Sequence, residues 1–366
     1  MTGPVKGWCP GALRPMESGD GWIIRLRPFA GRLSAAQLTG LAALAQSHGI
    51  AAFSLSNRAN LQLRGLTARQ IAPLQQGLRD LGLIDPSPEI EARRNILMTP
   101  CHMPADQSLP LYRALDAALG ALPVLPAKFG FAVDTGSFAC LQQAPADLRF
   151  EISAEGLILR AEGMELGEIQ PDIPTAIARV IEICQWFAAR AASARRMGAL
   201  VRTGTLRPLR AEIAPRESRL PDGLLYAPFG EVGPNQLAAL GTGIRLTPWR
   251  AILPEAPAKD IAGWITEPDD PLMRIDACPG APHCRNATVQ TRALGPQLAP
   301  LIAAGERLHI SGCAKGCAAP WPSTVTLCGN CGRFDLVRNG KADEPPTKTG
   351  LSPDALFQHL RGFNAT

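Results

Sequence analysis

The chain has 366 residues and a net charge of +5, and 46% of its residues are hydrophobic while 5% are aromatic. This length exceeds that of an ordinary domain, so we expect two or three compact units with their own cores. Arg, Pro or Gly interrupts every apolar stretch before the roughly 18 residues of a membrane helix, and the N-terminal residues lack the apolar run of a signal peptide. These features exclude a membrane protein and favour the cytoplasm.

Ten cysteines in such a chain are typical of metal ligands or buried thiols rather than of a disulfide framework. The basic residues are 31 Arg against 6 Lys. Guanidinium groups suit bidentate binding of carboxylates, although a GC-rich genome produces the same bias. The arginine count alone therefore does not decide the function.

The first strand is predicted at Ile23–Arg27, within the string GWIIRLRPFAG. Alternation along a strand places Arg25 and Arg27 on one face, opposite Ile24 and Leu26. A strand of this kind suits the wall of a polar cavity.

A helix is predicted directly afterwards. Ser34 is the N-cap, Gln37 completes a capping box, and Gly49 ends the helix. Because a second strand follows, the unit reads strand, helix, strand.

An α/β segment is expected between about residues 93 and 215. It includes strands near Lys128–Val133 and Leu157–Ala161 and a helix from Thr175 to about Arg195. Cys184 falls on the apolar stripe of this helix, which indicates core packing rather than metal binding.

The string GLLYAPFGEVGPNQLAALGTGIRLTPWRAILP repeats the plan of the first unit. Gly31, Leu33, Gln37, Leu38 and Leu41 recur at a constant offset as Gly230, Val232, Gln236, Leu237 and Leu240, and Pro28-Phe29 recurs as Pro228-Phe229 at nearly that offset. The second helix is about two turns shorter, and Arg58 and Arg250 occupy related places. A duplicated β-α-β unit predicts a pseudo-twofold domain, whereas chance similarity of two Leu/Ala-rich helices is the alternative.

Four cysteines in the last quarter form the most informative pattern of the chain. Cys278 and Cys284 form a C-x5-C pair, and Cys313 and Cys317 form a C-x3-C pair. Two short loops that each deliver two thiolates can hold one cubane 4Fe-4S cluster, and their glycines let the backbone approach it. Zinc sites usually space paired ligands by two to four residues, so the first pair fits zinc poorly. We predict a cluster, with zinc and plain buried thiols as alternatives.

The remaining cysteines carry weaker signals. Cys328 and Cys331 form a C-x2-C pair suited to zinc, redox exchange or a second cluster, but no second pair nearby completes four ligands. Cys9 repeats the CPGA string of the first cluster loop and is expected to serve a turn. Cys101 and Cys140 are expected in the core or in a cavity wall.

Together these strings resemble the sirohaem-type sulfite and nitrite reductase superfamily over nearly the whole chain, and within it the precorrin-3B synthase family of aerobic cobalamin biosynthesis. The family's C-x5-C and C-x3-C motif is met by the four cysteines, and its duplicated half-domains correspond to the repeat. In the reductases the last of these cysteines, Cys317 here, also bridges the cluster to the haem iron.

Four further strings, IIRLRPFAG, SNRANLQLRG, RRNILMTP and LPAKFG, resemble family segments that bind the carboxylates of a tetrapyrrole. The residues carried over from them are Arg25, Arg27, Arg58, Gln62, Arg64, Arg94, Asn95 and Lys128. Arg64 departs from the pattern, because histidine is usual there. Lys128 is also the catalytic candidate, to polarise oxygen or to protonate an intermediate.

Gly130 is a second departure, because the reductases carry a second active-site lysine at that place. Reduction of a small oxyanion needs several protons and cationic stabilisation, so the missing lysine argues against reductase chemistry. The string CPG followed by RPMESGDG is typical of the cobalamin branch.

The resemblance implies that the tetrapyrrole is a substrate. The family hydroxylates precorrin-3A with an oxygen atom from O2 and closes a lactone to give precorrin-3B, and an arginine-lined site suits so acidic a ring. The implied cofactors are the 4Fe-4S cluster, which passes single electrons, and a separate mononuclear non-haem iron. An external reductant, NADH or a reductase, is implied as well, and neither nucleic acid nor membrane is expected as a partner.

Two other functions remain open. A sulfite or nitrite reductase would bind sirohaem tightly, and a non-enzymatic tetrapyrrole carrier or sensor would bind the ring without turnover.

The ligands of the mononuclear iron are the weakest point of the sequence. Such an iron commonly uses two His and a carboxylate. His102 lies four residues before Asp106, His283 lies inside the first cysteine loop, and His309 lies four residues before Cys313. Each of these histidines is more often structural, so the sequence defines no ligand set.

We therefore expect an α+β fold in which duplicated ferredoxin-like half-domains form a pseudo-twofold domain, joined by two α/β domains of the nitrite/sulfite reductase type. The predicted boundaries are 1–92 for the first half-domain, 93–215 for a macrocycle-binding domain, 216–258 for the second, shorter half-domain and 259–366 for the iron-sulfur domain.

Overall fold

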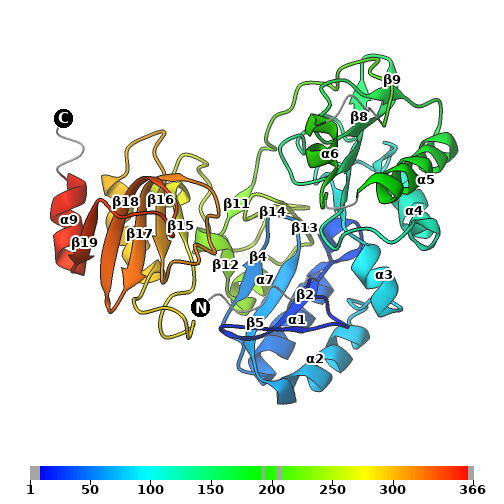
Figure 1. The fold of residues 1–366 in the computed structure, drawn as a ribbon. Coiled ribbons are helices and arrows are strands. Elements are labelled where there is room, and N and C mark those ends of the chain that lie inside the picture. The colour runs from blue at the N-terminus through cyan, green and yellow to red at the C-terminus, as the bar shows by residue number, and fades with distance from the viewer. Residues whose placement is uncertain (1–8, 192–193, 204–207, 362–366) are drawn as a thin grey trace.

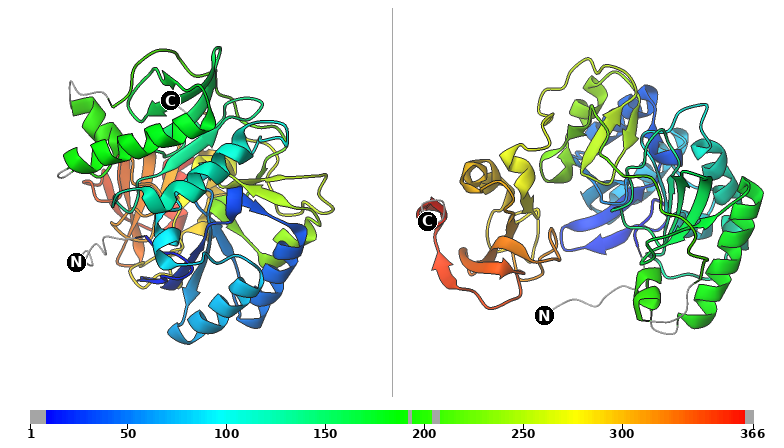
Figure 2. Two further views of the ribbon diagram at one scale, coloured as in Figure 1. Left: turned by 90° about the vertical axis from the view of Figure 1, so that its right-hand side faces the viewer. Right: turned by 90° about the horizontal axis from the view of Figure 1, so that it is seen from above.

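The computed structural model describes residues 9–191, 194–203 and 208–361. In this part of the chain the strands form four sheets. The duplicated unit lies between the C-terminal sheet on one side and the middle α/β unit on the other (Figures 1 and 2). The predicted α+β fold is confirmed, whereas the domain boundaries stay predictions.

Two sheets belong to the duplicated unit. The first has the order β1-β2-β5-β4-β12, formed by Met16–Ser18, Gly21–Leu26, Leu61–Leu66, Phe53–Leu55 and Glu231–Val232. The second has the order β11-β14-β13-β3, formed by Leu225–Tyr226, Ala251–Pro254, Ile244–Leu246 and Arg32–Leu33.

The other two sheets flank this unit. The middle sheet has the order β10-β9-β8-β7-β6, formed by Glu168–Ile169, Gly156–Ala161, Leu148–Ser153, Phe131–Asp134 and Ile96–Met98. The C-terminal sheet has the order β15-β16-β17-β18-β19, formed by Ile275–Ala277, Leu308–Ser311, Ser323–Asn330, Arg333–Gly340 and Lys348–Leu351.

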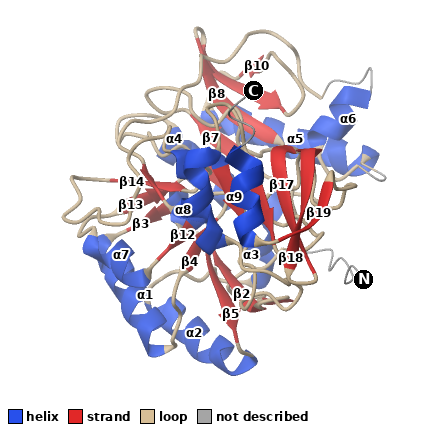
Figure 3. Ribbon diagram, turned by 90° about the vertical axis from the view of Figure 1, so that its left-hand side faces the viewer, coloured by secondary structure: helices blue, strands red, loops and turns tan. Residues whose placement is uncertain are grey.

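Helices cover these sheets. In chain order they are α1 Ala35–Ser47, α2 Ala68–Asp80, α3 Pro88–Arg93, α4 Ser108–Ala118, α5 Ile173–Arg190, α6 Met197–Thr203, α7 Pro234–Ala239, α8 Gly295–Leu298 and α9 Pro353–Arg361. The last helix lies against the C-terminal sheet (Figure 3), where Leu356 and Leu360 pack into its core.

The two copies of the repeat exchange strands. β3 of the first copy pairs with β13 of the second, and β12 of the second pairs with β4 of the first. Each copy enters its helix through a turn with one left-handed residue other than glycine, Ala30 at φ 51° and Phe229 at φ 56°. Ala30 therefore corresponds to Phe229 in the structure. The Pro28-Phe29 and Pro228-Phe229 dipeptides are accordingly shifted by one residue relative to each other. This reciprocal exchange confirms the predicted pseudo-twofold domain.

The helices of the repeat behave as predicted. The side chain of Gln37 accepts a hydrogen bond from Ser34 N–H at 3.0 Å, and that of Gln236 accepts one from Gly233 N–H at 3.3 Å. α1 has 13 residues and α7 has 6, so the second helix is two turns shorter.

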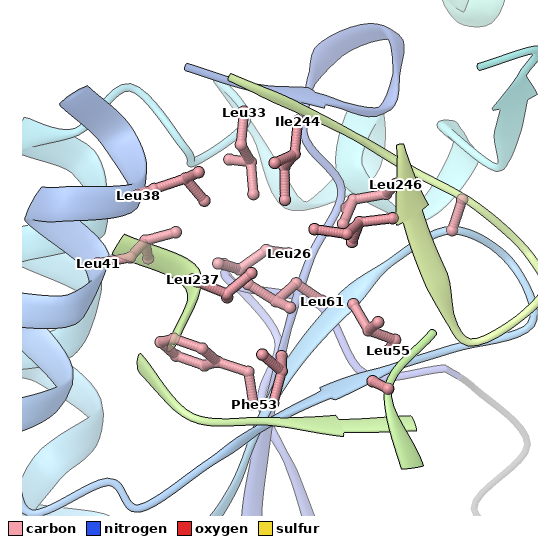
Figure 4. Packing of buried hydrophobic residues seen from close by; sticks show 14 of the residues in the cluster. Leu26, Leu33, Leu38, Leu41, Phe53, Leu55, Leu61, Leu237, Ile244 and Leu246 are labelled. Carbon is pink, nitrogen blue, oxygen red and sulfur yellow. The ribbon is translucent and has the colours of Figure 1, made fainter. Parts of the chain in front are cut away.

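The core of the duplicated unit is shared by both copies. Figure 4 shows Leu26, Leu33, Leu38, Leu41, Phe53, Leu55 and Leu61 from the first copy packed with Leu237, Ile244 and Leu246 from the second. Each fully buried side chain of this size contributes about 1.5–3 kcal/mol. The exchange of strands thus buries faces that neither copy would cover alone.

The middle unit departs from the sequence predictions in two details. α5 ends at Arg190 rather than near Arg195, and β7 begins at Phe131, so Lys128 lies in the turn before the strand. Cys184 is fully buried on α5, as predicted.

Candidate functional site

Three arginines gather at the first sheet of the duplicated unit. Arg25 lies on β2, Arg27 follows its end, and Arg58 lies in the turn between β4 and β5. Burial first, and then the charges of Arg27 and Arg58, lower the pKa of Arg25. Burial first, and then the charges of Arg196 and Arg27, lower the pKa of Arg58, so the three groups of the sheet lie near one another. We call Arg25, Arg27 and Arg58 the arginine cluster. Gln62 on β5 pairs directly with Arg25.

Arg27 is buried and Arg25 and Arg58 are half-buried, and nearby carboxylates such as Glu91 and Asp147 act on this cluster only from outside ion-pair distance. Burial, followed by the charge of Arg27, lowers the pKa of Arg25 to about 10, and burial is the main cause of the lowered pKa of Arg27 and Arg58. The Nε atoms of Arg25 and Arg27 are buried without a hydrogen-bond partner. Within the described residues none of the three guanidinium groups forms an ion pair with a carboxylate. Such a site favours an anionic ligand, because the ligand supplies the missing charge.

A cavity of about 810 Å³ adjoins the arginine cluster. Its lining includes Cys9, Arg14, Arg27, Arg93, Asn95 and Phe129. The volume lies in the range of small-molecule sites. Asn95 shapes the wall, because its Nδ2 donates to the carbonyl oxygens of Ala127 and Phe129, both at 3.2 Å. These bonds hold the turn that carries Lys128, whose side chain is exposed.

Gly130 makes room for Arg58. A Cβ atom at Gly130 would lie 3.1 Å from the carbonyl oxygen of Asn95 and 3.2 Å from Nη1 of Arg58. The guanidinium group of Arg58 therefore lies where the side chain of any larger residue at position 130 would begin.

The remaining predicted arginines have partners inside the chain. Arg64 forms a bidentate pair with Asp20, at 2.8 and 3.0 Å. Nη2 of Arg94 lies 2.6 Å from the Asp85 carboxylate, and its Nη1 donates to Tyr112 Oη at 3.5 Å. These pairs leave Arg64 and Arg94 less able than the arginine cluster to bind a new anion.

Parallel strands deliver the first member of each cysteine pair to one edge of the C-terminal sheet. β15 pairs with β16 in parallel, and Cys278 and Cys313 follow their carboxyl ends. The N–H of Gly312 donates to Sγ of Cys278 at 3.1 Å. A Cβ atom at Gly312 would lie 2.5 Å from the Cβ of Ala287, so only glycine lets the two loops approach this closely.

The four thiols of the two pairs lie close enough to influence one another. Burial first, and then the charges of Cys278, Cys313 and Cys284, raise the pKa of Cys317. Cys328 lies beside them on β17, paired with Ser311. Burial raises its pKa to about 11, with a further contribution from Cys313.

The cysteine loops also touch the duplicated unit. A Cβ atom at Gly19, in the turn between β1 and β2, would lie 3.6 Å from Sγ of Cys284. From the second copy, Arg250 binds Asp276 at 2.6 Å and the carbonyl oxygen of Ala318 at 3.3 Å. The thiols therefore adjoin the sheet whose second strand carries Arg25.

The described part of the chain forms no site for a single metal ion. Across residues 9–191, 194–203 and 208–361, no three His, Cys, Asp or Glu side chains converge closely enough to hold one ion. A cubane places each thiolate on a different iron atom, so its ligands stand farther apart than those of one ion.

The candidate iron ligands are dispersed. Nδ1 of His102 lies 3.0 Å from the Thr99 carbonyl oxygen, and Asp106 accepts hydrogen bonds from backbone N–H groups. His283 is exposed. His309 is fully buried on β16, and neither ring nitrogen has a partner among the described residues.

Sequence reasoning missed Cys9 as a cavity residue. It lines the cavity and lies close to Arg25, where its thiol partly offsets the lowering of the Arg25 pKa by burial and by Arg27. Its CPGA string, shared with the first cluster loop, is the signal that could have marked Cys9 as a site residue, although it was interpreted as a turn. Arg196 was missed too. After burial, its charge is the next cause of the lowered pKa of Arg58, and it pairs with Asp147 at 2.9 Å, a residue 49 positions away that no local pattern connects with it.

Comparisons with known proteins agree on the class. Residues 14–81 match the family model of the nitrite/sulfite reductase ferredoxin-like half domain. The fold resembles that in the structure of the Mycobacterium tuberculosis NirA protein, with a TM-score of 0.64, 17% identity, and coverage of 93% of this chain and 79% of that one. The fold is therefore of the nitrite/sulfite reductase type.

One relative is more specific. The chain is 29% identical to a Sinorhizobium sp protein named precorrin-3B synthase, over 93% of this chain and 84% of that protein. This confirms the resemblance drawn from the sequence strings. No helix in the described part of the chain is long and apolar enough to cross a membrane.

Proposed function

We propose that this protein is a precorrin-3B synthase, which hydroxylates precorrin-3A with O2 and forms a lactone to give precorrin-3B in cobalamin biosynthesis. The arginine cluster carries the proposal, because within the described structure its three guanidinium groups form no ion pair with a carboxylate and belong to the sheet whose first turn lies against Cys284. The relative named precorrin-3B synthase supports the same reaction. We place the enzyme in the cytoplasm.

The arginine cluster would bind the carboxylates of the tetrapyrrole. Charge-assisted contacts from Arg25, Arg27 and Arg58 would fix a planar ligand in one orientation, with Gln62 donating a further hydrogen bond. Burial strengthens these contacts because water competes less for them. Arg64 and Arg94 would hold the sheet and the cavity wall in place from their internal ion pairs.

Asn95 and Lys128 would serve the cavity rim. Asn95 holds the turn on which Lys128 stands, and the exposed ammonium of Lys128 would supply a proton at the reacting carbon or oxygen.

Cys278, Cys284, Cys313 and Cys317 would hold the 4Fe-4S cluster. The close approach at Gly312 and the mutual influence of the thiols fit such a group. A cluster bound there supplies single electrons from an external reductant, NADH or a reductase. The family also implies a mononuclear iron, for which the described residues provide no converged ligand set.

A sirohaem-dependent sulfite or nitrite reductase is the alternative, and the NirA fold is compatible with it. Arg58 occupies the space over Gly130, where the reductases carry a lysine. This observation favours the synthase.

The decisive experiment uses the full chain purified without oxygen. We expect iron and sulfide without a haem spectrum. Incubation with precorrin-3A, a reductant and isotope-labelled O2 should give a product that has gained one labelled oxygen atom. A bound haem together with sulfite or nitrite consumption would instead identify a reductase.

Replacement of Cys284 by Ser tests the cluster site. We expect the variant to lose cluster absorbance and turnover together, because a cubane with three ligands is labile. Cys331→Ser is the matched control, since Cys331 is an exposed thiol outside both pairs. Full turnover of the Cys284 variant would refute the assignment.

A further inference from the structure

Residues 9–14, which we call the strap, border the cavity of about 810 Å³ and lead into β1. Cys9, Gly11 and Arg14 of the strap line the cavity together with Arg27. The N–H of Arg25 donates to the carbonyl oxygen of Gly11 at 3.3 Å. The strap is therefore one wall of the cavity and lies against the strand that carries Arg25.

One carboxylate holds the strap in this place. Glu91 on α3 is 3% exposed, and its side chain accepts hydrogen bonds from the N–H groups of Ala12 and Leu13. The backbone nitrogen of Leu13 lies 3.1 Å from each of the two carboxylate oxygens. A Cβ atom at Gly11 would overlap Oε2 of Glu91, so only glycine lets the strap approach this closely. Hydrogen bonds to a charged acceptor are among the stronger ones in proteins, so this contact fixes the strap.

The same residue connects the strap with the arginine cluster. Nη1 of Arg27 donates to the backbone carbonyl oxygen of Glu91. From α2, Nε2 of Gln75 donates to the carbonyl oxygen of Ala12 at 2.8 Å and adds a second support to the strap. Glu91 thus holds the strap with its side chain and Arg27 with its backbone, which sets the spacing of two parts of one cavity.

The lining of this cavity is partly cationic and partly apolar. Arg14 and Arg27 supply positive charge, whereas Leu122, Leu125 and Phe129 supply apolar surface. A flat ring with carboxylates at its edge matches both parts, because its face packs on apolar side chains while its carboxylates bind guanidinium groups. Such a lining suits one edge of a tetrapyrrole better than a purely apolar ligand.

We infer that Glu91 is a positioning residue of the tetrapyrrole site, which holds the strap as a preformed wall against one edge of the ring. The inference rests on the proposed function for the identity of the ligand. A wall that is fixed before binding loses little conformational freedom when the ligand arrives, so the anchored strap binds the ring more tightly than a loose one. Cys9, at the start of the strap, reports on this state because it lines the cavity.

The first test uses the ligand-free full chain, purified without oxygen, and the variant Glu91→Gln. Glutamine keeps the size of the side chain but replaces one acceptor oxygen by an NH2 group, which cannot accept a hydrogen bond from the strap. We expect N-ethylmaleimide to alkylate Cys9 at least about fivefold faster in the variant, because the strap opens more often. Peptide mapping measures the rate. Cys331, exposed in the turn between β17 and β18, is the internal control and should react equally in both proteins. An unchanged Cys9 rate would overturn the role of Glu91.

The second test adds uroporphyrin III, a stable tetrapyrrole rich in carboxylates. It should slow the alkylation of Cys9 in the wild-type protein, and fluorescence titration should show about tenfold weaker binding to Glu91→Gln. Glu155→Gln, an exposed change in the turn between β8 and β9, should bind as the wild type does. Failure of the wild-type protein to bind the ring would contradict the proposed function as well, whereas equal affinity of wild type and Glu91→Gln would contradict only the role of Glu91.

Two further variants reach the same contact from other residues. Gly11→Ala leaves the carboxylate in place but pushes the strap away from it, so it should reproduce both effects of Glu91→Gln. Gln75→Ala removes only the bond to Ala12, from a partly exposed position on α2, and should change both quantities in the same direction by a smaller factor. Circular dichroism checks that each variant is folded at the assay temperature. Wild-type Cys9 reactivity and ring affinity in folded Gly11→Ala and Gln75→Ala would overturn the inference.

Discussion

At the scale of single residues, the arginine cluster favours binding of an anionic ligand and lowers the stability of the ligand-free protein. Arg27 is a buried cation and Arg25 and Arg58 are half-buried ones, and loss of hydration lowers the pKa of each. A lowered pKa in a basic group means that the folded protein keeps the charge at a cost. A site that holds uncompensated charge before its ligand arrives is common where function outweighs stability.

Arg58→Gln tests this conflict. Removing one of the three charges should raise the free energy of unfolding of the ligand-free protein by roughly 1 kcal/mol. Binding of the tetrapyrrole should weaken about tenfold, because a charge-assisted contact is lost. Thermal melting and anaerobic titration measure the two effects. Arg113→Gln, an exposed change on α4, should alter neither quantity.

Gly130→Lys tests the space that Arg58 occupies. The new Cβ would meet the Asn95 carbonyl oxygen and the Arg58 guanidinium, so we expect Arg58 to be displaced and the protein to lose about 1–3 kcal/mol of stability. Tetrapyrrole affinity should fall, and sulfite reduction should not appear. Gly120→Lys is the control, since no atom lies within 4 Å of its Cβ position. Unchanged affinity in the Gly130 variant would show that Arg58 is not needed for binding.

At the scale of elements, two parallel strands bring the cysteine pairs together. The carboxylate of Asp276 links one of these strands to the duplicated unit through an ion pair with Arg250. Asp276 on β15 is 1% exposed and bridges Arg250 at 2.6 Å and Arg307 at 2.8 Å. The related hairpin turns of the two copies thus send their arginines to different places. Arg58 joins the arginine cluster, whereas Arg250 braces the strand that precedes Cys278.

Asp276→Ala should cost roughly 2 kcal/mol of stability, less than a fully buried pair, because both arginines are partly exposed. The cluster should also be lost faster under chelator, because Arg250 would no longer brace the strand before Cys278. Chemical denaturation and the decay of iron absorbance measure these effects. Asp222→Ala removes the exposed Arg219–Asp222 pair and should change stability by well under 1 kcal/mol. If the two variants lose iron at the same rate under chelator, Asp276 does not stabilise the cluster site.

At the scale of the whole molecule, exchanged strands make the two copies one cooperative unit. Leu237 on α7 is 1% exposed in the shared core, so Leu237→Ala should cost about 2–5 kcal/mol. Circular dichroism and tryptophan fluorescence should still report a single coincident transition for this unit. Leu220→Ala, at a position 47% exposed, is the control. A separate early transition of the second copy alone would contradict the shared core.

The sequence by itself determined the local and periodic features of this protein. The capping box of Ser34 and Gln37 and the repeat around Gln37 and Gln236 are encoded within short segments, and the structure contains the elements that they predicted. The spacing of the four cysteines is equally local, and the cluster that it indicates stays a prediction. Such signals survive in sequence because backbone hydrogen bonding and apolar periodicity depend on near neighbours.

Only the tertiary structure decided which side chains meet. Eight residues carried over by resemblance looked alike in sequence, yet Arg64 and Arg94 are paired with Asp20 and Asp85 while the arginine cluster is left without carboxylate partners. Long-range partners depend on how distant segments pack, and packing is a property of the whole chain rather than of any short string.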